Sequence, residues 1–160
     1  MAKIKKSQDS PKRQSQYNLD IAVYNSQKII SLSQSSVKKM VKGLLDHFQL
    51  KTEGLAVHFV TKNRISHLHH QFFNDPTPTD CITFPIDPHF LGEIFICPEV
   101  AIEYASRKKI DPYVELSRYL IHSFLHLLGF DDQDSQSKRK MRQKENQFLK
   151  LLKEQGLILK

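Results

Sequence analysis

The sequence predicts an α+β fold, in which a small mixed four-stranded sheet is covered by about five helices. The chain has 160 residues, which is enough for one domain with a substantial hydrophobic core. Short segments have the length and β-branched content of strands, and longer ones repeat their apolar residues with a helical period. The order is one strand, then helix, strand and helix, then two strands and three helices. This order favours the α+β class.

Both ends of the chain are strongly basic. Residues 1–17 have no apolar period and are predicted to form a flexible basic arm, which leaves residues 18–160 as the single domain. Of the net charge of +7, residues 1–17 contribute +4 and residues 135–160 contribute +6, so the segment between them is slightly acidic. Two basic ends favour a polyanionic partner such as RNA. The alternative interpretation is a solvated tail and a lysine-rich outer helix face.

Composition argues against a membrane or secreted protein. No run of about 18 apolar residues exists, so a membrane span is excluded, and Met1–Ser10 lacks the apolar core of a secretory signal. Cys81 and Cys97 form no CxxC pair and are expected to be buried free thiols in a reducing compartment. The sequence therefore predicts a cytoplasmic protein.

The first half of the domain is predicted to form two strands, each followed by a helix. Leu19–Tyr24 and Leu55–Val60 have the length and residue types of strands. Ser35 or Ser36 is expected to cap a helix that ends near Phe48. The apolar residues of this helix share one face: Val37, Met40, Val41, Leu44, Leu45 and Phe48.

A second helix is expected to begin after Asn63, as its cap, and to end near Phe73. Ile65, Leu68 and Phe72 form its inward stripe. The same helix carries three histidines that are either a second metal site or a solvated face: His67, His69 and His70.

A loop and a hairpin are predicted next. Two prolines make residues 75–80 (DPTPTD) a loop, because proline has no N–H for a helix or sheet. Cys81–Ile86 and Leu91–Cys97 are expected to be strands joined by a short turn.

The last third of the chain is predicted to be helical. Pro98 is expected to begin a helix that ends near Lys108, and Pro112 one that ends near Leu128 at Gly129. A final helix from about Ser135 to Glu154 is expected to bury Met141, Phe148, Leu149 and Leu152.

The segment that carries chemistry is residues 122–132 (HSFLHLLGFDD). His122 and His126 lie on one helical face, about 40° apart around the axis, and can share one metal ion. Gly129 can end the helix and turn the chain back, so that Asp132 supplies a third ligand; Asp131 is an alternative oxygen ligand. This spacing matches the ligand frame of metzincin proteases. Three protein ligands leave an open position, as catalytic sites do.

One residue argues against a protease. In HExxH proteases, the residue after the first histidine is the glutamate that deprotonates the metal-bound water. Here that residue is Ser123, which cannot act as a base near neutral pH. A bound metal can still lower the pKa of its water toward about 7, so a hydrolase with another kind of substrate remains open.

At three places the sequence resembles the YbeY family of metal-dependent endoribonucleases. Residues 122–132 are similar to the family signature HGxLHLxGYDH, residues 79–85 (TDCITFP) to TDVLSFP, and residues 91–97 (LGEIFIC) to LGDIxIC. Met141 and Glu145 fall where the last helix of the family carries M-x3-E. These matches span about residues 65–150 in the family's order.

The resemblance implies an α+β fold with a groove beside the metal, lined on one side by the sheet. It also implies Zn²⁺ as the ion, with other divalent metals open, and an endoribonuclease that cleaves single-stranded RNA in maturation of the small-subunit ribosomal RNA 3′ end and in ribosome quality control. Ribosomal RNA is the expected partner, with ribosomal proteins or an assembly GTPase as further partners. His122 is the candidate catalytic residue as well as a metal ligand, and Thr79 and Asp80 are candidates for the RNA groove, unless they only cap the turn.

Several residues depart from the family pattern. Asp132 stands where the third ligand is usually histidine; a carboxylate weakens Lewis acidity and favours harder ions. Ser123 replaces a glycine, Glu93 an aspartate and His69 an asparagine. Phe73 stands where the family usually carries an arginine that faces the RNA.

Two functions follow from these departures. If Arg64 or Arg118 substitutes for the missing arginine, the chain is a hydrolytic endoribonuclease. Otherwise it is an RNA-binding ribosome-assembly factor with a mainly structural metal and weak or no nuclease activity. A metalloprotease is a distant third interpretation.

Overall fold

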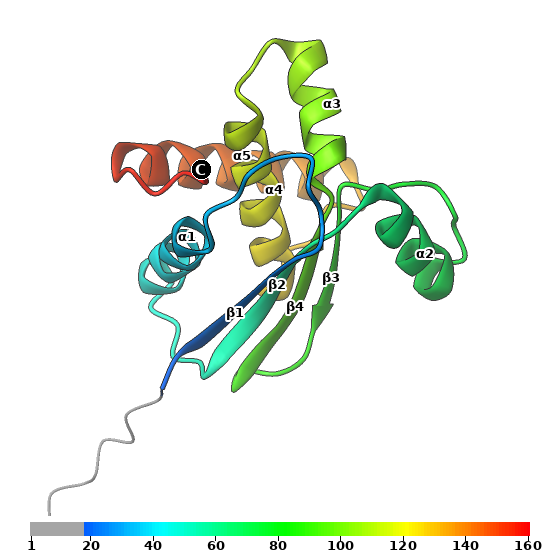
Figure 1. Ribbon diagram of the computed structural model, residues 1–160. Coiled ribbons are helices and arrows are strands. Elements are labelled where there is room, and N and C mark those ends of the chain that lie inside the picture. Colours follow the sequence, from blue (N-terminus) through cyan, green and yellow to red (C-terminus); the bar gives the residue numbers. More distant parts are fainter. Residues whose placement is uncertain (1–17) are drawn as a thin grey trace, which may run out of the picture.

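A four-stranded mixed sheet forms the centre of the computed structural model, which describes residues 18–160 (Figure 1). Its strands are β1 (Asp20–Asn25), β2 (Gly54–Phe59), β3 (Cys81–Pro85) and β4 (Phe90–Ile96). They lie in the order β1-β2-β4-β3, with β1, β2 and β4 parallel and β3 antiparallel to β4. The predicted basic arm, residues 1–17, lies outside the described residues.

Within residues 18–160, five helices accompany this sheet, which confirms the predicted α+β class. Their bounds are α1 (Gln34–His47), α2 (Lys62–Phe73), α3 (Pro98–Lys108), α4 (Pro112–Leu127) and α5 (Ser135–Glu154). Helices α1, α4 and α5 share the main hydrophobic core with one face of the sheet, and α2 packs on the other face (Figure 1).

Helix α4 is the central helix of the main core. Successive strand residues point to opposite faces, so Leu55, Val57 and Phe59 of β2 enter this core while His58 faces away from it. Five apolar residues of α4 are each at most 1% exposed: Leu116, Leu120, Ile121, Phe124 and Leu125. Apolar side chains around most of its surface hold α4 rigidly, and His122 and His126 are half-buried on its remaining stripe.

The cap of α1 lies earlier than predicted. Its N-cap is Ser33, whose hydroxyl accepts a hydrogen bond from the Ser36 N–H, rather than Ser35 or Ser36. Three serines compete for the cap in this sequence, and the C-terminus of the chain decides between them. The Ser33 N–H and the Ser36 hydroxyl both donate to the Lys160 carbonyl, at 2.8 and 3.1 Å.

The cap of α2 also differs from the prediction. Thr61, rather than Asn63, accepts from the Arg64 N–H at 3.2 Å. Both residue types can cap a helix, and a choice between them depends on where β2 ends. The Val60 N–H is still bonded to the Ile96 carbonyl beyond the end of β2, so Thr61 is the first residue available to cap the helix, which begins at Lys62.

The predicted inward stripe of α2 is right for two residues and wrong for the third. Ile65 and Leu68 are buried in the smaller core, but Phe72 is 54% exposed. Its ring packs edge-on against Phe84, with centroids 4.9 Å apart. Helix α2 covers only part of its sheet face, so the last turn extends beyond the core.

The described residues support two of the composition arguments. Cys97 is buried and Cys81 half-buried, and both are free thiols. None of the helices in residues 18–160 is long and apolar enough to cross a membrane.

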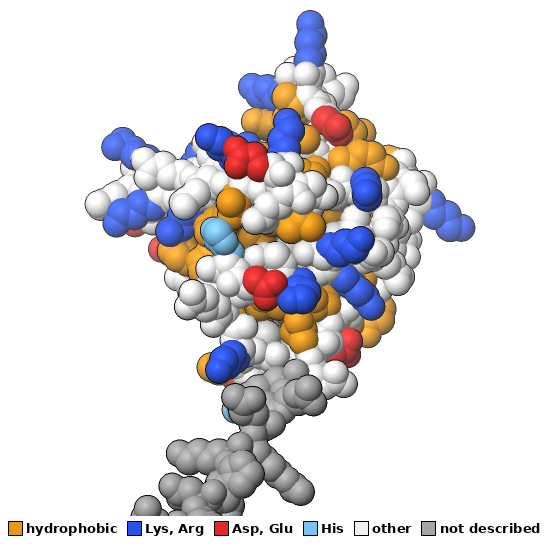
Figure 2. Space-filling view, turned by 90° about the vertical axis from the view of Figure 1, so that its left-hand side faces the viewer, with side chains coloured by type: hydrophobic (Ala, Val, Ile, Leu, Met, Phe, Trp, Pro, Cys, Tyr) orange, Lys and Arg blue, Asp and Glu red, His pale blue; other side chains and the backbone are white. Residues whose placement is uncertain are grey.

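Basic side chains are spread over the outer face formed by α1 and the C-terminal part of α5. Figure 2 shows Lys and Arg side chains separated by hydrophobic ones, with few acidic side chains between them. On this face they do not gather into one patch.

Candidate metal centre

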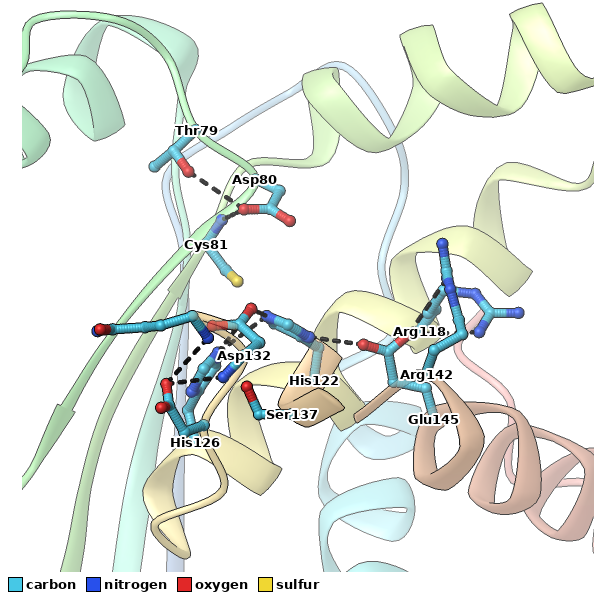
Figure 3. Close-up of polar contacts among 12 residues, drawn as sticks. Thr79, Asp80, Cys81, Arg118, His122, His126, Asp132, Ser137, Arg142 and Glu145 are labelled. Atoms are coloured by element: carbon cyan, nitrogen blue, oxygen red, sulfur yellow. Dashed lines mark hydrogen bonds and ion pairs between the residues drawn. The ribbon is translucent and has the colours of Figure 1, made fainter. Parts of the chain in front are cut away.

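Three side chains converge beside the C-terminal end of α4 (Figure 3). His122 and His126 lie one turn apart, and their Nε2 atoms are 3.0 Å from each other. The Asp132 Oδ2 atom is 3.5 Å from each of these nitrogens. The three donor atoms therefore form a nearly equilateral triangle. Among residues 18–160, this is the only cluster of three or more His, Cys, Asp or Glu residues suited to hold a metal ion.

This donor triangle fits a divalent metal ion. Two zinc–nitrogen bonds of about 2.0–2.1 Å at a tetrahedral angle separate their nitrogens by about 3.3 Å, close to the observed spacings. Two imidazoles and one carboxylate are ligands that zinc accepts, and the carboxylate also suits harder ions. Three ligands from the protein leave one tetrahedral position for a water or a substrate atom.

The turn after α4 brings Asp132 to the histidines. Gly129 has a φ of +90°, a conformation that a Cβ atom disfavours, and it reverses the chain directly after the helix. The Gly129 and Phe130 N–H groups donate to the His126 and Leu125 carbonyls, which closes this turn. Asp134 then caps α5 by accepting from the Ser137 N–H, so a second helix fixes the far end of the loop.

The structure distinguishes the two aspartates that the sequence left open. Asp131 Oδ1 accepts from the N–H groups of Asp132 and Gln133, at 2.7 and 3.2 Å, and its side chain is exposed. The carboxylate of Asp131 is therefore used to form the turn. Asp132, one residue later, is half-buried and directed at the two histidines.

A buried carboxylate orients the first histidine. Glu145 of α5 accepts a hydrogen bond from His122 Nδ1 at 2.6 Å and is only 6% exposed. Because the proton is held at Nδ1, the Nε2 lone pair of His122 is directed at the metal position. Arg142 and Arg118 approach the other oxygen of Glu145, at 3.2 and 3.5 Å (Figure 3).

The charges of this pair depend on one another. Burial by itself would raise the pKa of Glu145, but the hydrogen bond from His122, the positive charge of His122 when it is protonated, and the charges of Arg142 and Arg118 lower it below its usual value. Burial would lower the pKa of His122, whereas the hydrogen bond to Glu145 raises it. Glu145 is therefore a carboxylate, which strengthens His122 as a ligand.

From the sequence, Glu145 stands out only because Met141 and Glu145 match the M-x3-E pattern of the family, and no contact is predicted for it. The signal in the sequence is that Glu145 lies on the same face as the buried Met141, Phe148 and Leu152. A carboxylate on an apolar helix face is rarely buried without a partner. The sequence alone does not indicate that this partner is His122, which is 23 residues away.

Replacement of Glu145 by glutamine is expected to weaken metal binding by about 10- to 100-fold, because an amide accepts a weaker hydrogen bond from His122 and carries no charge. Competition with a chromophoric chelator would measure the affinity for Zn²⁺ and Co²⁺. Glu154→Gln, an exposed substitution on the same helix, is the matched control. Wild-type affinity in a folded Glu145→Gln variant would contradict the assigned role.

Two cavities meet at the donor triangle. The aromatic cavity has a volume of about 380 Å³, and the cationic cavity one of about 610 Å³. Both are lined by Asp80, His122 and Asp132. The aromatic cavity is also lined by His69, Phe73, Cys81, Ile82, Thr83 and Pro85. The cationic cavity is named for Arg118, Lys138 and Arg142 in its lining.

The structure brings three of the four predicted groove residues to these cavities. Asp80 lines both, and Thr79 and Arg118 line the cationic cavity. Asp80 also accepts from the Thr79 hydroxyl and from the Cys81 N–H, at 3.1 and 2.8 Å, so it both caps the start of β3 and lines the site. Arg64 lines neither cavity. It borders a separate hollow together with Tyr24, His58 and Phe95.

Other predicted candidates lie outside the donor triangle. Ser123 is fully buried and lines neither cavity. His69 Nδ1 is 2.8 Å from the Thr77 carbonyl, and His67 and His70 are exposed. Within residues 18–160 these three histidines form no metal cluster, so the interpretation as a solvated, partly packed face is favoured.

Fold and site together define a class: an α+β protein whose central helix carries two histidines of a candidate three-ligand metal site. The model of the family described as endoribonuclease YbeY matches residues 6–153. The chain therefore belongs to the YbeY family.

Individual relatives agree with this assignment. The endoribonuclease YbeY of Chlamydia pneumoniae is 42% identical over 154 residues, which are 90% of this chain and 98% of that protein. The endoribonuclease YbeY of Protochlamydia amoebophila is 39% identical over 142 residues, covering 85% and 95%. The solution structure of TM1509 from Thermotoga maritima has a TM-score of 0.58 at 24% identity, covers 81% of this chain and 87% of that one, and shows likeness of fold alone.

Proposed function

We propose that this chain is a metal-dependent endoribonuclease that cleaves single-stranded RNA in maturation of the small-subunit ribosomal RNA 3′ end and in ribosome quality control. The observation that carries the proposal is the convergence of His122, His126 and Asp132 between two open cavities. Membership of the YbeY family and the printed name of the relatives support the RNA substrate and the hydrolytic reaction.

Each side chain of the site has a part in this reaction. The Nε2 atoms of His122 and His126 and one oxygen of Asp132 would hold the ion. A divalent metal bound there supplies a Lewis acid and lowers the pKa of a coordinated water toward neutrality. Asp80, the other carboxylate that lines both cavities, can accept a proton between them. Glu145 holds the imidazole of His122 in place.

The cationic cavity suits the phosphates of the substrate. Lys138 and Arg142 of its lining are exposed, and Arg118 is half-buried. Positive groups beside the scissile phosphate stabilise the charge that builds up during the reaction. Zn²⁺ is the proposed ion, ribosomal RNA the proposed partner, and the cytoplasm, where free thiols persist, the proposed location.

Removal of the metal is expected to abolish cleavage. The protein would be dialysed against a chelator and assayed on a labelled single-stranded RNA, on its duplex and on a precursor of small-subunit ribosomal RNA. We expect no cleavage without metal, recovery on addition of one equivalent of Zn²⁺ or Mn²⁺, and little cleavage of the duplex. Undiminished cleavage by metal-free protein would overturn the proposal.

A second candidate function is an RNA-binding ribosome-assembly factor with a mainly structural metal. It is favoured by the engagement of both Arg118 and Arg142 with Glu145 and by the absence of any Lys or Arg from the lining of the aromatic cavity. Unfolding on chelation, with RNA binding and no cleavage in any metal-loaded sample, would support this candidate over the nuclease.

A further inference from the structure

The aromatic cavity contains an exposed aromatic ring close to the metal centre. Phe73, in the last turn of α2, is 58% exposed and lines this cavity together with His122 and His126. It is the most exposed large apolar side chain in the lining of either cavity. A phenyl ring in that position gains little from folding, because water still covers more than half of it.

A neighbouring imidazole and the loop behind it hold this ring in place. The rings of His69 and Phe73 are in contact, with centroids 5.6 Å apart and planes tilted by 53°. His69 Nδ1 is 2.8 Å from the Thr77 carbonyl, and the carboxylate of Asp75 lies 4.0 Å away. The imidazole is thus fixed to the loop of residues 75–80, and Phe73 packs on a fixed neighbour. Because the ring is already held by its neighbours, a ligand that binds against it loses little free energy to the ordering of this side chain.

Strand β3 supplies most of the remaining lining of the aromatic cavity. Pro85 lines it together with Cys81, Thr83 and the buried Ile82. The last turn of α2, β3 and the donor triangle thus border one cavity. A flat, partly apolar group can enter it.

The charges of the two cavities differ. No Lys or Arg lines the aromatic cavity, whereas Asp80 and Asp132 do. The basic side chains Arg118, Lys138 and Arg142 line the cationic cavity instead, beside the carboxylates of Asp80, Glu115, Asp132 and Glu145. Because only the cationic cavity offers basic side chains, a phosphate group is favoured there over the position beside Phe73, while an uncharged nucleobase is suited to the aromatic side. This difference in charge between the two cavities favours a nucleobase as the occupant of the aromatic cavity.

We infer that the aromatic cavity is a nucleobase subsite, in which the base next to the scissile phosphate stacks on Phe73 while the phosphates of the strand lie toward Arg118, Lys138 and Arg142. This inference rests on the proposed RNA substrate. Stacking on an aromatic side chain needs an unpaired base and is tolerant of sequence, so the subsite selects single strands rather than a particular base.

The test combines a protein variant with a substrate variant. Phe73→Ala and Phe73→Trp would be assayed on a single-stranded oligoribonucleotide and on a series in which one nucleotide at a time is abasic. We expect Phe73→Ala to raise KM by roughly 10- to 100-fold with little change in kcat, and Phe73→Trp to retain wild-type KM. At one position in the series, loss of the base should raise the KM of the wild type by a similar factor and leave the KM of Phe73→Ala unchanged.

Phe72→Ala is the matched control, because Phe72 is on the same helix, is 54% exposed and contacts Phe84 rather than the aromatic cavity. Fluorescence anisotropy would measure the affinity of the zinc-loaded protein for the same oligonucleotides, and this measurement does not require cleavage. It therefore tests the nucleobase subsite even if the protein proves not to be a nuclease. If Phe73→Ala still distinguishes the abasic position as the wild type does, the nucleobase subsite is wrong.

Discussion

Replacement of His126 by alanine is expected to abolish RNA cleavage and to lower the affinity for Zn²⁺ by at least about 100-fold, because one of three protein ligands is lost. His126 is a cleaner target than His122. The polar contacts of its imidazole are to His122 and Asp132, so its removal leaves the bond between His122 and Glu145 intact. Metal stoichiometry after gel filtration and cleavage of labelled single-stranded RNA would measure both effects.

The control for this variant is His67→Ala, which removes an exposed histidine of α2 and should leave metal content and cleavage unchanged. Far-ultraviolet circular dichroism would verify that both variants are folded. If His126→Ala still bound one equivalent of zinc with wild-type affinity, the metal would have to lie elsewhere, and the centre described here would be refuted.

Replacement of Gly92 by alanine is expected to destabilise the protein by about 3 kcal/mol or more. Gly92 has a φ of +142°, and a Cβ there would lie 2.1 Å from the Phe84 carbonyl oxygen and 2.9 Å from a methyl group of Leu127. The backbone of β3 must move to make room, and the Leu127 side chain of α4 must shift as well. Asp80 directly precedes β3 and α4 carries His126, so the metal affinity should also fall. Urea unfolding with and without Zn²⁺ would measure both changes.

Gly156→Ala separates the cost of the positive φ from the cost of the steric clash at Gly92. Gly156 also has a positive φ, +69°, but a Cβ there would meet nothing within 4 Å. Its substitution should cost only the left-handed backbone conformation, about 1–2 kcal/mol. Equal destabilisation by the two substitutions would show that the close approach of β3, β4 and α4 at Gly92 contributes nothing.

Local signals in the sequence predicted most element boundaries well. Proline at the first position placed the starts of α3 and α4 correctly at Pro98 and Pro112, and Gly129 lies where α4 was expected to end. The hairpin of β3 and β4 was also predicted, because short apolar strands flank a proline-containing turn. These features depend on residues close together in the chain, which is why local rules suffice.

The predictions failed where several residues of the same type competed or where a helix left the core. Ser33 was chosen over Ser35 and Ser36 through contacts with Lys160, at the opposite end of the chain. Phe72 has the helical spacing of an inward residue, yet α2 ends beyond the part of the sheet that could bury it. Periodicity gives the direction of a side chain around its helix, not what lies opposite it.

By itself, the sequence determined the pairing of His122 with His126, since an α-helix places residues four apart on one face whatever surrounds them. It also placed a glycine and two aspartates close behind, without choosing between the aspartates. Only the tertiary structure decided that Asp132 faces the histidines, that Glu145 holds His122 and that Arg64 lies outside both cavities. These outcomes depend on how α4 packs against α5 and β3. Such packing is the sum of many weak contacts between residues far apart in the chain, which no local pattern specifies.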